Sequence, residues 1–141
     1  MKRKWFDIFI NVAVPIIIGA VLYYLFCPDI AFVQRIDSWA GTGLHLFVVS
    51  DCFVYRIIRN YLFDFLWAYS LMSGAVLLCG TDSFNRRPVV LAVVVFEILM
   101  ELSQLSPDIK GTCDIFDLIA EGVANVLVIK KFPGGDRNEK K

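Results

Sequence analysis

The chain has 141 residues, of which 57% are hydrophobic, and its 14 basic residues balance its 14 acidic residues. The hydrophobic share exceeds that of an average soluble domain, and the balanced charge argues against a nucleic-acid partner. The length suits one small domain. We therefore expect a single all-α membrane domain over residues 1–132 that lies in a lipid bilayer, followed by a charged cytoplasmic tail over residues 133–141.

Four apolar segments are long enough to cross a bilayer, which takes roughly 17 to 25 residues. They are Phe6–Phe26, Tyr61–Gly80, Pro88–Leu105 and Cys113–Ile129. The basic start before the first segment is also typical of a signal peptide. However, this apolar run is longer than a usual signal core, and no small-x-small cleavage site follows it. We therefore interpret it as a retained first helix of a polytopic helical bundle.

Prolines and glycines indicate where these helices bend, begin and turn. Pro15 predicts a kink inside the first helix. Pro88 stands where a missing N–H costs nothing, so we place the start of the third helix there. Pro107 and Gly111 interrupt the chain between the last two segments and predict a tight helical hairpin.

The region between the first two spans is more ambiguous. Residues 27–43 are rich in polar side chains and predict a loop. The segment Leu44–Arg59 is strongly apolar but short, and it ends in two arginines. A short tilted span, a re-entrant segment and an amphipathic interfacial helix are all compatible with this pattern.

Basic residues gather at the start of the chain, at Arg86 and Arg87, and at its end. Cytoplasmic loops carry an excess of lysine and arginine, and four spans place all three clusters on one side. We therefore predict four spans with both termini in the cytoplasm and residues 44–59 outside. The four cysteines have no metal-ligand spacing and are interpreted as small buried residues.

The last two spans each carry a polar stripe. Glu97, Glu101 and Gln104 follow the spacing i, i+4, i+7 and fall within an arc of roughly 60° on a helix. The next helix carries a second stripe within roughly 80°, made of Asp114, Asp117, Glu121 and Asn125. Polar groups that face a bundle interior while the other faces meet lipid produce this pattern, and such groups often mark a functional site.

In a hairpin, residues equally far from the turn meet at one level. Glu101 and Asp117 then both lie about 6 Å below the outer end, and Glu97 and Glu121 about 12 Å below it. Asp64 begins the second span near the same end. The sequence predicts an acidic pocket in the outer half of the membrane. A purely structural role, in hydrogen bonds between helices or at a helix N-cap for Asp114, is the alternative.

So many carboxylates in one poorly solvated place must hold protons or be neutralised by cations. Arg56 and Arg59 are candidate partners, although contact with lipid headgroups explains them equally well. A bound divalent cation is a further candidate, because clustered carboxylates suit hard metal ions. No cofactor motif is present, and His45 is interpreted as an interfacial residue.

The acidic hairpin also resembles a known family. The pattern Glu101-Leu-x-Gln104, followed by Gly111-Thr112-x-Asp114-x-x-Asp117-x-x-x-x-Gly122, is similar to the C-terminal hairpin of VanZ-like membrane proteins. The stretch from Tyr61 to Leu71 resembles the preceding helix of that family, except that the histidine often seen there is absent. The resemblance implies a role in the bacterial cell envelope, linked to resistance to the glycopeptide teicoplanin.

Three hypotheses for function follow from these patterns. The first is a VanZ-like protein whose acidic pocket binds a lipid-linked envelope precursor or a glycopeptide. The second is an intramembrane enzyme that acts on lipid headgroups with carboxylates or a metal. The third is a small proton- or cation-coupled transporter. All three use one predicted set of pocket residues: Arg56, Arg59, Asp64, Glu97, Glu101, Gln104, Thr112, Asp114, Asp117 and Glu121.

Overall fold

The computed structural model describes residues 2–28, 31–41, 43, 45, 61–79, 83–105 and 114–133. Within these ranges the secondary structure is helical without a strand, which confirms the all-α class. The predicted amphipathic segment lies outside the described residues except for His45, and so do the turn before the last helix and the end of the tail. Arg56, Arg59 and Thr112 fall in those parts.

The chain begins with one continuous helix made of three parts. These are α1 (Lys2–Ile8), the π-helix η1 (Phe9–Ala13) and α2 (Val14–Phe26). Of the described helices, only the stretch Lys4–Phe26 is both long and apolar enough to cross a membrane. The irregularity expected at Pro15 takes the form of this π-helix, one turn earlier. Proline has no N–H for the helical ladder, and a widened turn before it accommodates the missing bond.

A helix, α3 (Ala31–Ala40), stands where we predicted only a polar loop, so that prediction was wrong. Polar residues interrupt its sequence, but one face of the helix is apolar. On that face Val33 is fully buried, and Ile36, one turn later, is half-buried. The helix ends at Gly41, whose N–H donates to the Asp37 carbonyl at 2.9 Å and whose φ is 62°. Glycine adopts this left-handed conformation without strain and commonly ends helices.

The remaining helices are α5 (Phe63–Cys79), α6 (Ser83–Ser103) and α7 (Ile115–Lys131). The predicted start of the third span at Pro88 was wrong, because α6 already begins at Ser83 and contains that proline. Near a helix start the ring removes only one intrahelical bond, to the Phe84 carbonyl. The basic loop predicted around Arg86 is therefore largely helical.

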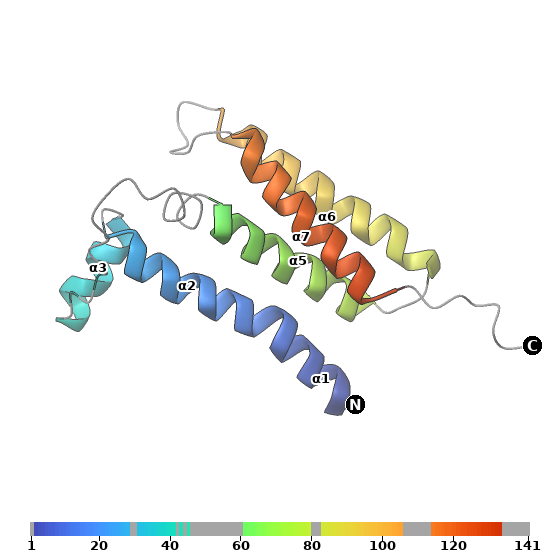
Figure 1. Cartoon of the computed structure of the whole chain (residues 1–141), viewed down its shortest axis with the longest axis horizontal. Helices are drawn as coiled ribbons and strands as arrows, with labels where there is room; N and C mark the ends of the chain where they lie inside the picture. The colour runs from blue at the N-terminus through green and yellow to red at the C-terminus, as the bar shows by residue number, and fades with distance from the viewer. Residues whose placement is uncertain are drawn as a thin grey trace, which may run out of the picture.

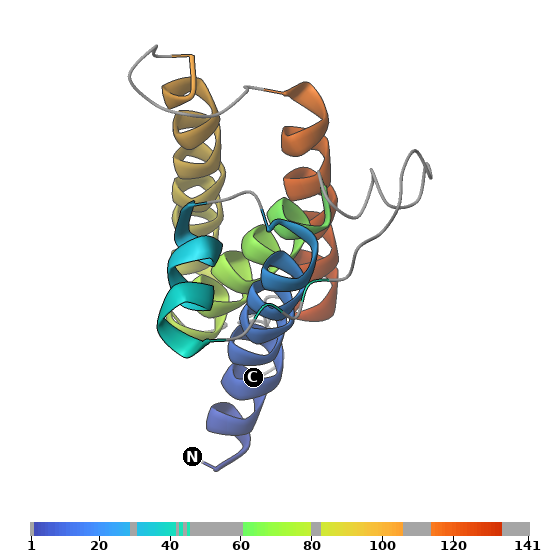
Figure 2. The ribbon, with the colours of Figure 1, turned by 90° about the vertical axis from the view of Figure 1, so that its left-hand side faces the viewer.

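Helix α5 occupies the centre of the bundle, with α2 on one side and α6 and α7 on the other (Figures 1 and 2). It contacts all three helices, whereas α6 and α7 contact each other less extensively. Small residues permit the close approach of the first helix. A Cβ atom added at Gly19 would lie 3.7 Å from Leu66, and one added at Gly74 would lie 3.7 Å from Val12.

The distribution of polarity on α6 and α7 is partly the reverse of that in a soluble helical domain, although apolar residues such as Met72 and Val76 also lie inside the bundle. Large apolar side chains such as Leu91, Leu99 and Ile119 are more than half exposed on the outer surface of α6 and α7. Polar side chains lie inside, among them Glu97 and Asn125. Soluble proteins almost never bury acidic residues fully unless they are paired, and they seldom expose large contiguous apolar surfaces.

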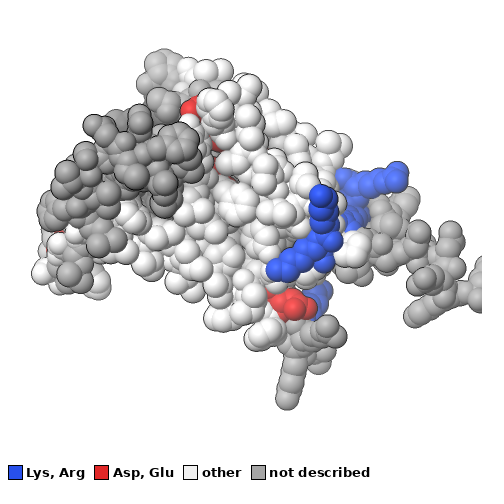
Figure 3. All heavy atoms as spheres, viewed as in Figure 1, with Lys and Arg blue, Asp and Glu red and all other residues white. Residues whose placement is uncertain are grey.

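The two ends of the bundle differ in charge. Lysine and arginine side chains gather at one end (right-hand side of Figure 3), where α1 and α6 begin and α7 ends. There Lys131 donates to Asn11 at 2.7 Å and to the Tyr69 hydroxyl at 3.0 Å, which ties α7 to η1 and α5. The acidic residues of α5 and α7 lie near the starts of these helices, at the opposite end.

Candidate functional site

The buried face of α6 is unusual because, among the side chains of α6 that the structure describes, two of the three buried ones are acids. Val93, Glu97 and Glu101 follow one another at intervals of four residues, so they share one side of the helix. Helix α7 turns a matching face toward the interior through Glu121 and Asn125. Four residues of the predicted stripes therefore face the interior, whereas Gln104, Asp114 and Asp117 are only half-buried.

A short hydrogen bond joins these two faces. The Asn125 amide Nδ2 donates to Oε2 of Glu97 at 2.6 Å, across 28 positions of the sequence. Our equal-depth pairing placed Glu97 opposite Glu121, one turn away from its actual hydrogen-bond partner. Glu97 and Glu121 still interact electrostatically. The offset arises because α7 packs mainly on α5, so its register is not set by a symmetric hairpin with α6.

The outer end of the stripes lies where α6 ends and α7 begins. Gln104 Nε2 donates to Oε1 of Glu101 at 3.0 Å, so both residues of the predicted Glu-x-x-Gln pattern act together. Asp114 is the N-cap of α7, and its carboxylate accepts the N–H of Phe116 at 3.0 Å. The structural role considered for Asp114 is thereby confirmed, because side-chain acceptors at this position satisfy free N–H groups of the first turn.

The acid of α5 belongs to the same cluster. Asp64, Glu101 and Asp117 lie within electrostatic reach of one another, and Glu121 interacts with all three and with Glu97. Three helices thus contribute five carboxylates to one region of the interior. We call this set the acidic cluster: Asp64, Glu97, Glu101, Asp117 and Glu121.

Several oxygens of this cluster lack a partner. Glu97, Glu101 and Glu121 are only 3%, 4% and 5% exposed, and each has one carboxyl oxygen that accepts no hydrogen bond from a described residue. Between described residues, no lysine, arginine or histidine forms an ion pair with them. Buried acceptors without donors are costly, because they lose their hydrogen bonds to water and gain none in return. Within the described part of the chain, the cluster therefore has more buried carboxyl oxygens than donors.

A preformed metal site is absent from the part of the chain that the structure describes. No three histidine, cysteine, aspartate or glutamate side chains among these residues converge closely enough to hold a metal ion. Of the two described cysteines, Cys27 is buried as predicted, but Cys79 is exposed. The unpaired acceptors instead suit a group that donates several hydrogen bonds at once, such as an ammonium or a guanidinium.

A second polar group, which the sequence did not reveal, links α2, α3 and the residues after α3. The Asp37 carboxylate accepts the Tyr24 hydroxyl at 2.5 Å and lies 2.6 Å from Nε2 of His45. His45 Nδ1 lies 3.1 Å from the Tyr24 carbonyl oxygen. Our interpretation of His45 as a simple interfacial residue was therefore incomplete. Only the fold of α3 against α2 brings these three residues together.

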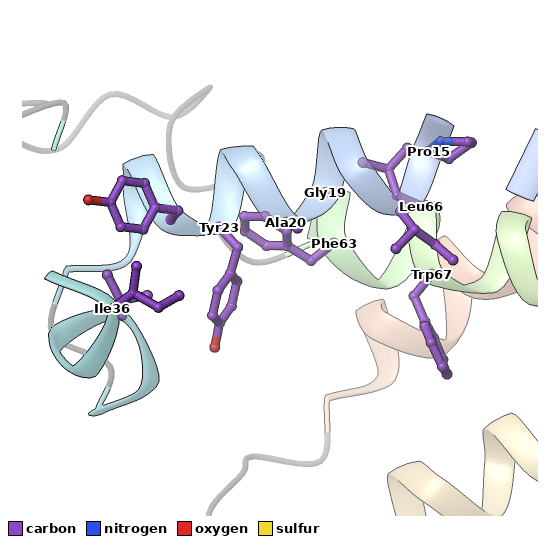
Figure 4. Close-up of a pocket in the computed structure, with 11 residues that line it drawn as sticks. Pro15, Gly19, Ala20, Tyr23, Ile36, Phe63, Leu66 and Trp67 are labelled. Carbon is purple, nitrogen blue, oxygen red and sulfur yellow. The ribbon is translucent and has the colours of Figure 1, made fainter. Parts of the chain in front are cut away.

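An apolar cavity of about 470 Å³ lies beside this group, between α2, α3 and α5. Figure 4 shows Tyr23, Ile36, Phe63, Leu66 and Trp67 around it. The cavity and the acidic cluster lie on different sides of α5, because Phe63 and Leu66 meet α2 whereas Asp64 faces the other acids. The cavity therefore does not form part of the acidic site.

The sequence matches no protein-family model, and the searches of curated proteins and of solved structures yield no match.

Proposed function

We propose that this chain is a multi-pass membrane protein, similar to VanZ-like proteins of the bacterial envelope, whose acidic cluster binds a cationic group of an envelope ligand. The observation that carries the proposal is that Glu97, Glu101 and Glu121 are buried between α6 and α7, each with one carboxyl oxygen that has no hydrogen-bond partner among the described residues. A lipid-linked precursor or a glycopeptide that bears an amine would supply the donors that these oxygens lack.

Membrane insertion is supported by the partly reversed polarity of α6 and α7. Helix α6 has 21 residues, a length of about 31 Å, which matches a hydrocarbon core of about 30 Å. Its exposed side chains are largely apolar, and its buried side chains include acids. A helix in lipid turns its apolar residues outward and its ionisable residues toward the bundle interior.

The charged end supports an orientation. Lys4, Arg86 and Lys131 belong to the end where α1 and α6 begin and α7 ends, and that end would face the cytoplasm by the positive-inside rule. The acidic cluster would then lie toward the outer leaflet. Two residues of the VanZ-like pattern, Glu101 and Gln104, are joined by a hydrogen bond in this region.

The interior favours a one-sided pocket over a transport route. Below the acids, Met72, Val76, Val93 and Val128 form an apolar core that occupies the middle of the bundle. A relay of protons or cations requires ionisable groups or water along its whole length. In the conformation described, this core separates the acidic cluster from the basic end.

The proposal is tested by substituting Glu101 and Asp117 individually, as Glu101→Gln and Asp117→Asn. Membrane insertion and the teicoplanin susceptibility of the host are measured together, and Asp7→Asn at the opposite end is the charge-matched control. We expect all three variants to insert, with altered susceptibility only for the two in the acidic cluster. Unaltered susceptibility in both inserted cluster variants would contradict a ligand site, and failed insertion in both would indicate a scaffold role.

A further inference from the structure

A second groove lies at the basic end, between α6 and the end of α7. It has a volume of about 440 Å³ and combines two arginines with four aliphatic side chains: Arg86, Arg87, Val90, Leu91, Val94 and Ile129. The two kinds of residue are separated along α6, because the arginines come first and the aliphatic residues follow toward the middle of the bundle. The groove therefore has a cationic mouth and an apolar floor.

Contacts within the groove leave most of this positive charge available. Arg86 Nη2 donates to the Ile129 carbonyl at 2.7 Å, which holds the guanidinium across the gap between α6 and α7. A guanidinium has five N–H donors, and Arg86 makes no second hydrogen bond to a described residue. Arg87 is exposed and forms no hydrogen bond or ion pair with another described residue.

We propose that this groove binds one anionic phospholipid, with its phosphate at Arg86 and Arg87 and an acyl chain along Val90, Leu91 and Val94. Charge complementarity supports the headgroup, because guanidinium groups pair with phosphate in a planar, two-pronged geometry. The positive N-terminal end of the α6 helix dipole also attracts an anionic phosphate.

The length of the groove is consistent with the proposed position of the acyl chain. From Arg86 to Val94 the helix rises by about 12 Å, close to the roughly 15 Å depth of one leaflet. The arginines lie in the first turns of α6, where a spanning helix reaches the headgroup region. Leu91 is 64% exposed, so a lipid chain can reach the floor of the groove from the side. This placement rests on the proposed membrane insertion of α6.

The test uses the full chain in nanodiscs that contain equal amounts of phosphatidylcholine and phosphatidylglycerol, followed by native mass spectrometry of the lipids retained. We expect preferential retention of phosphatidylglycerol. Arg87→Gln should lower that preference about tenfold, because it removes a charge-assisted hydrogen bond to the bound phosphate. Lys4→Gln removes the same charge from the first helix and should leave the preference unchanged.

A second variant tests the acyl part of the site. Val94→Trp fills the floor without altering charge and should also reduce retention of phosphatidylglycerol. Equal retention of the two lipids would contradict the proposed site. Equal loss of the phosphatidylglycerol preference in Arg87→Gln and Lys4→Gln would also contradict it, and would indicate diffuse charge attraction instead. Displacement of the lipid by millimolar inorganic phosphate would overturn it in favour of a simple phosphate site. A chain that fails to enter nanodiscs would contradict the membrane proposal itself.

Discussion

The hydrogen bond from Asn125 to Glu97 is the closest link between the two polar helix faces, at 2.6 Å. Glu97 keeps its other oxygen unpaired, so the bond satisfies only half of the carboxylate. Glu97 therefore has two roles in this account. One oxygen holds α6 against α7 through Asn125, and the other is available to a ligand of the proposed site.

Replacing Asn125 tests the structural half of this role. Asn125→Leu preserves side-chain size but leaves Glu97 buried without its donor, so we expect the free energy of unfolding to fall by about 1–3 kcal/mol. Thermal unfolding of the detergent-solubilised protein measures the change. Ser70→Ala is the control, because the Ser70 hydroxyl bonds only to the Leu66 carbonyl of its own helix. Equal stability of Asn125→Leu and the native chain would contradict this account.

His45 is held by two acceptors, and its charge state follows from them. The Asp37 carboxylate faces Nε2, and a backbone carbonyl faces Nδ1, so the ring can donate from both nitrogens only as imidazolium. The hydrogen bond to Asp37 raises the pKa of His45 above its ordinary 6.5. The Tyr24 hydroxyl, followed by His45, lowers the pKa of Asp37 below 3.8.

These two directions define a pH window for the contact between α2 and α3. The contribution from His45 is fully present below about pH 6.5 and is lost as the pH rises through its raised pKa. The contribution from Asp37 is present above about pH 3.8 and is lost as the pH falls through its lowered pKa. The pair should therefore stabilise the junction most between these values.

The chain contains a single histidine, so its titration is readable directly by proton NMR of the imidazole ring. We expect the pKa of His45 to exceed 6.5 in the native chain and to fall toward 6.5 in Asp37→Asn. A histidine that titrates at or below 6.5 in the native chain, or identically in the variant, would show that the contact with Asp37 does not form.

Among the helices, α5 determines how the others can approach. Its Gly74 faces Val12 of the π-helix, and Gly19 of α2 faces Leu66 of α5. Small residues at such crossings let helices approach closely, which matters in lipid because apolar burial alone does not drive helices together.

Two substitutions of Gly74 distinguish the effect of side-chain volume from the effect of glycine's backbone flexibility. An added Cβ would lie 3.7 Å from Val12, an ordinary contact, so Gly74→Ala should be neutral or stabilise the protein by up to about 1 kcal/mol. Gly74→Leu should displace the first helix and cost about 1–3 kcal/mol. Unfolding of the two variants in detergent measures the difference. Equal stability of both would show that the first helix does not pack on α5 at this point.

Local patterns in the sequence predicted some elements well and others poorly. The stripes on α6 and α7 were predictable because residues four apart share a helix face, and the Asp114 cap was predictable from the residue type before an apolar run. Helix α3 was missed because polar residues interrupt its sequence, and its apolar face includes Val33, which is fully buried.

Contacts between distant segments account for the rest. The pairing of Glu97 with Asn125 depends on how α6 and α7 each pack on α5, which spacing within one helix does not encode. The Asp37–His45 contact likewise depends on the fold of α3 back against Tyr24. Such sites arise from tertiary packing, whereas periodicity reveals only which residues face inward.

The described part of the molecule buries acids at one end and exposes large apolar side chains. Its basic side chains gather at the other end (Figure 3). In a membrane, the two proposals assign each end a separate partner. The acids would face an envelope ligand from outside, and the arginines would face anionic lipid from within. Both proposals require that α6, which carries Glu101 near one end and Arg87 near the other, crosses the bilayer.

Cysteine labelling on α6 tests that requirement most directly. In a chain whose four native cysteines are replaced by alanine, Gln104→Cys and Arg87→Cys are introduced separately, and cells are treated with a membrane-impermeant maleimide. We predict that position 104 is labelled in intact cells and that position 87 is labelled only after lysis. Labelling of both positions from the same side would contradict a membrane-spanning α6.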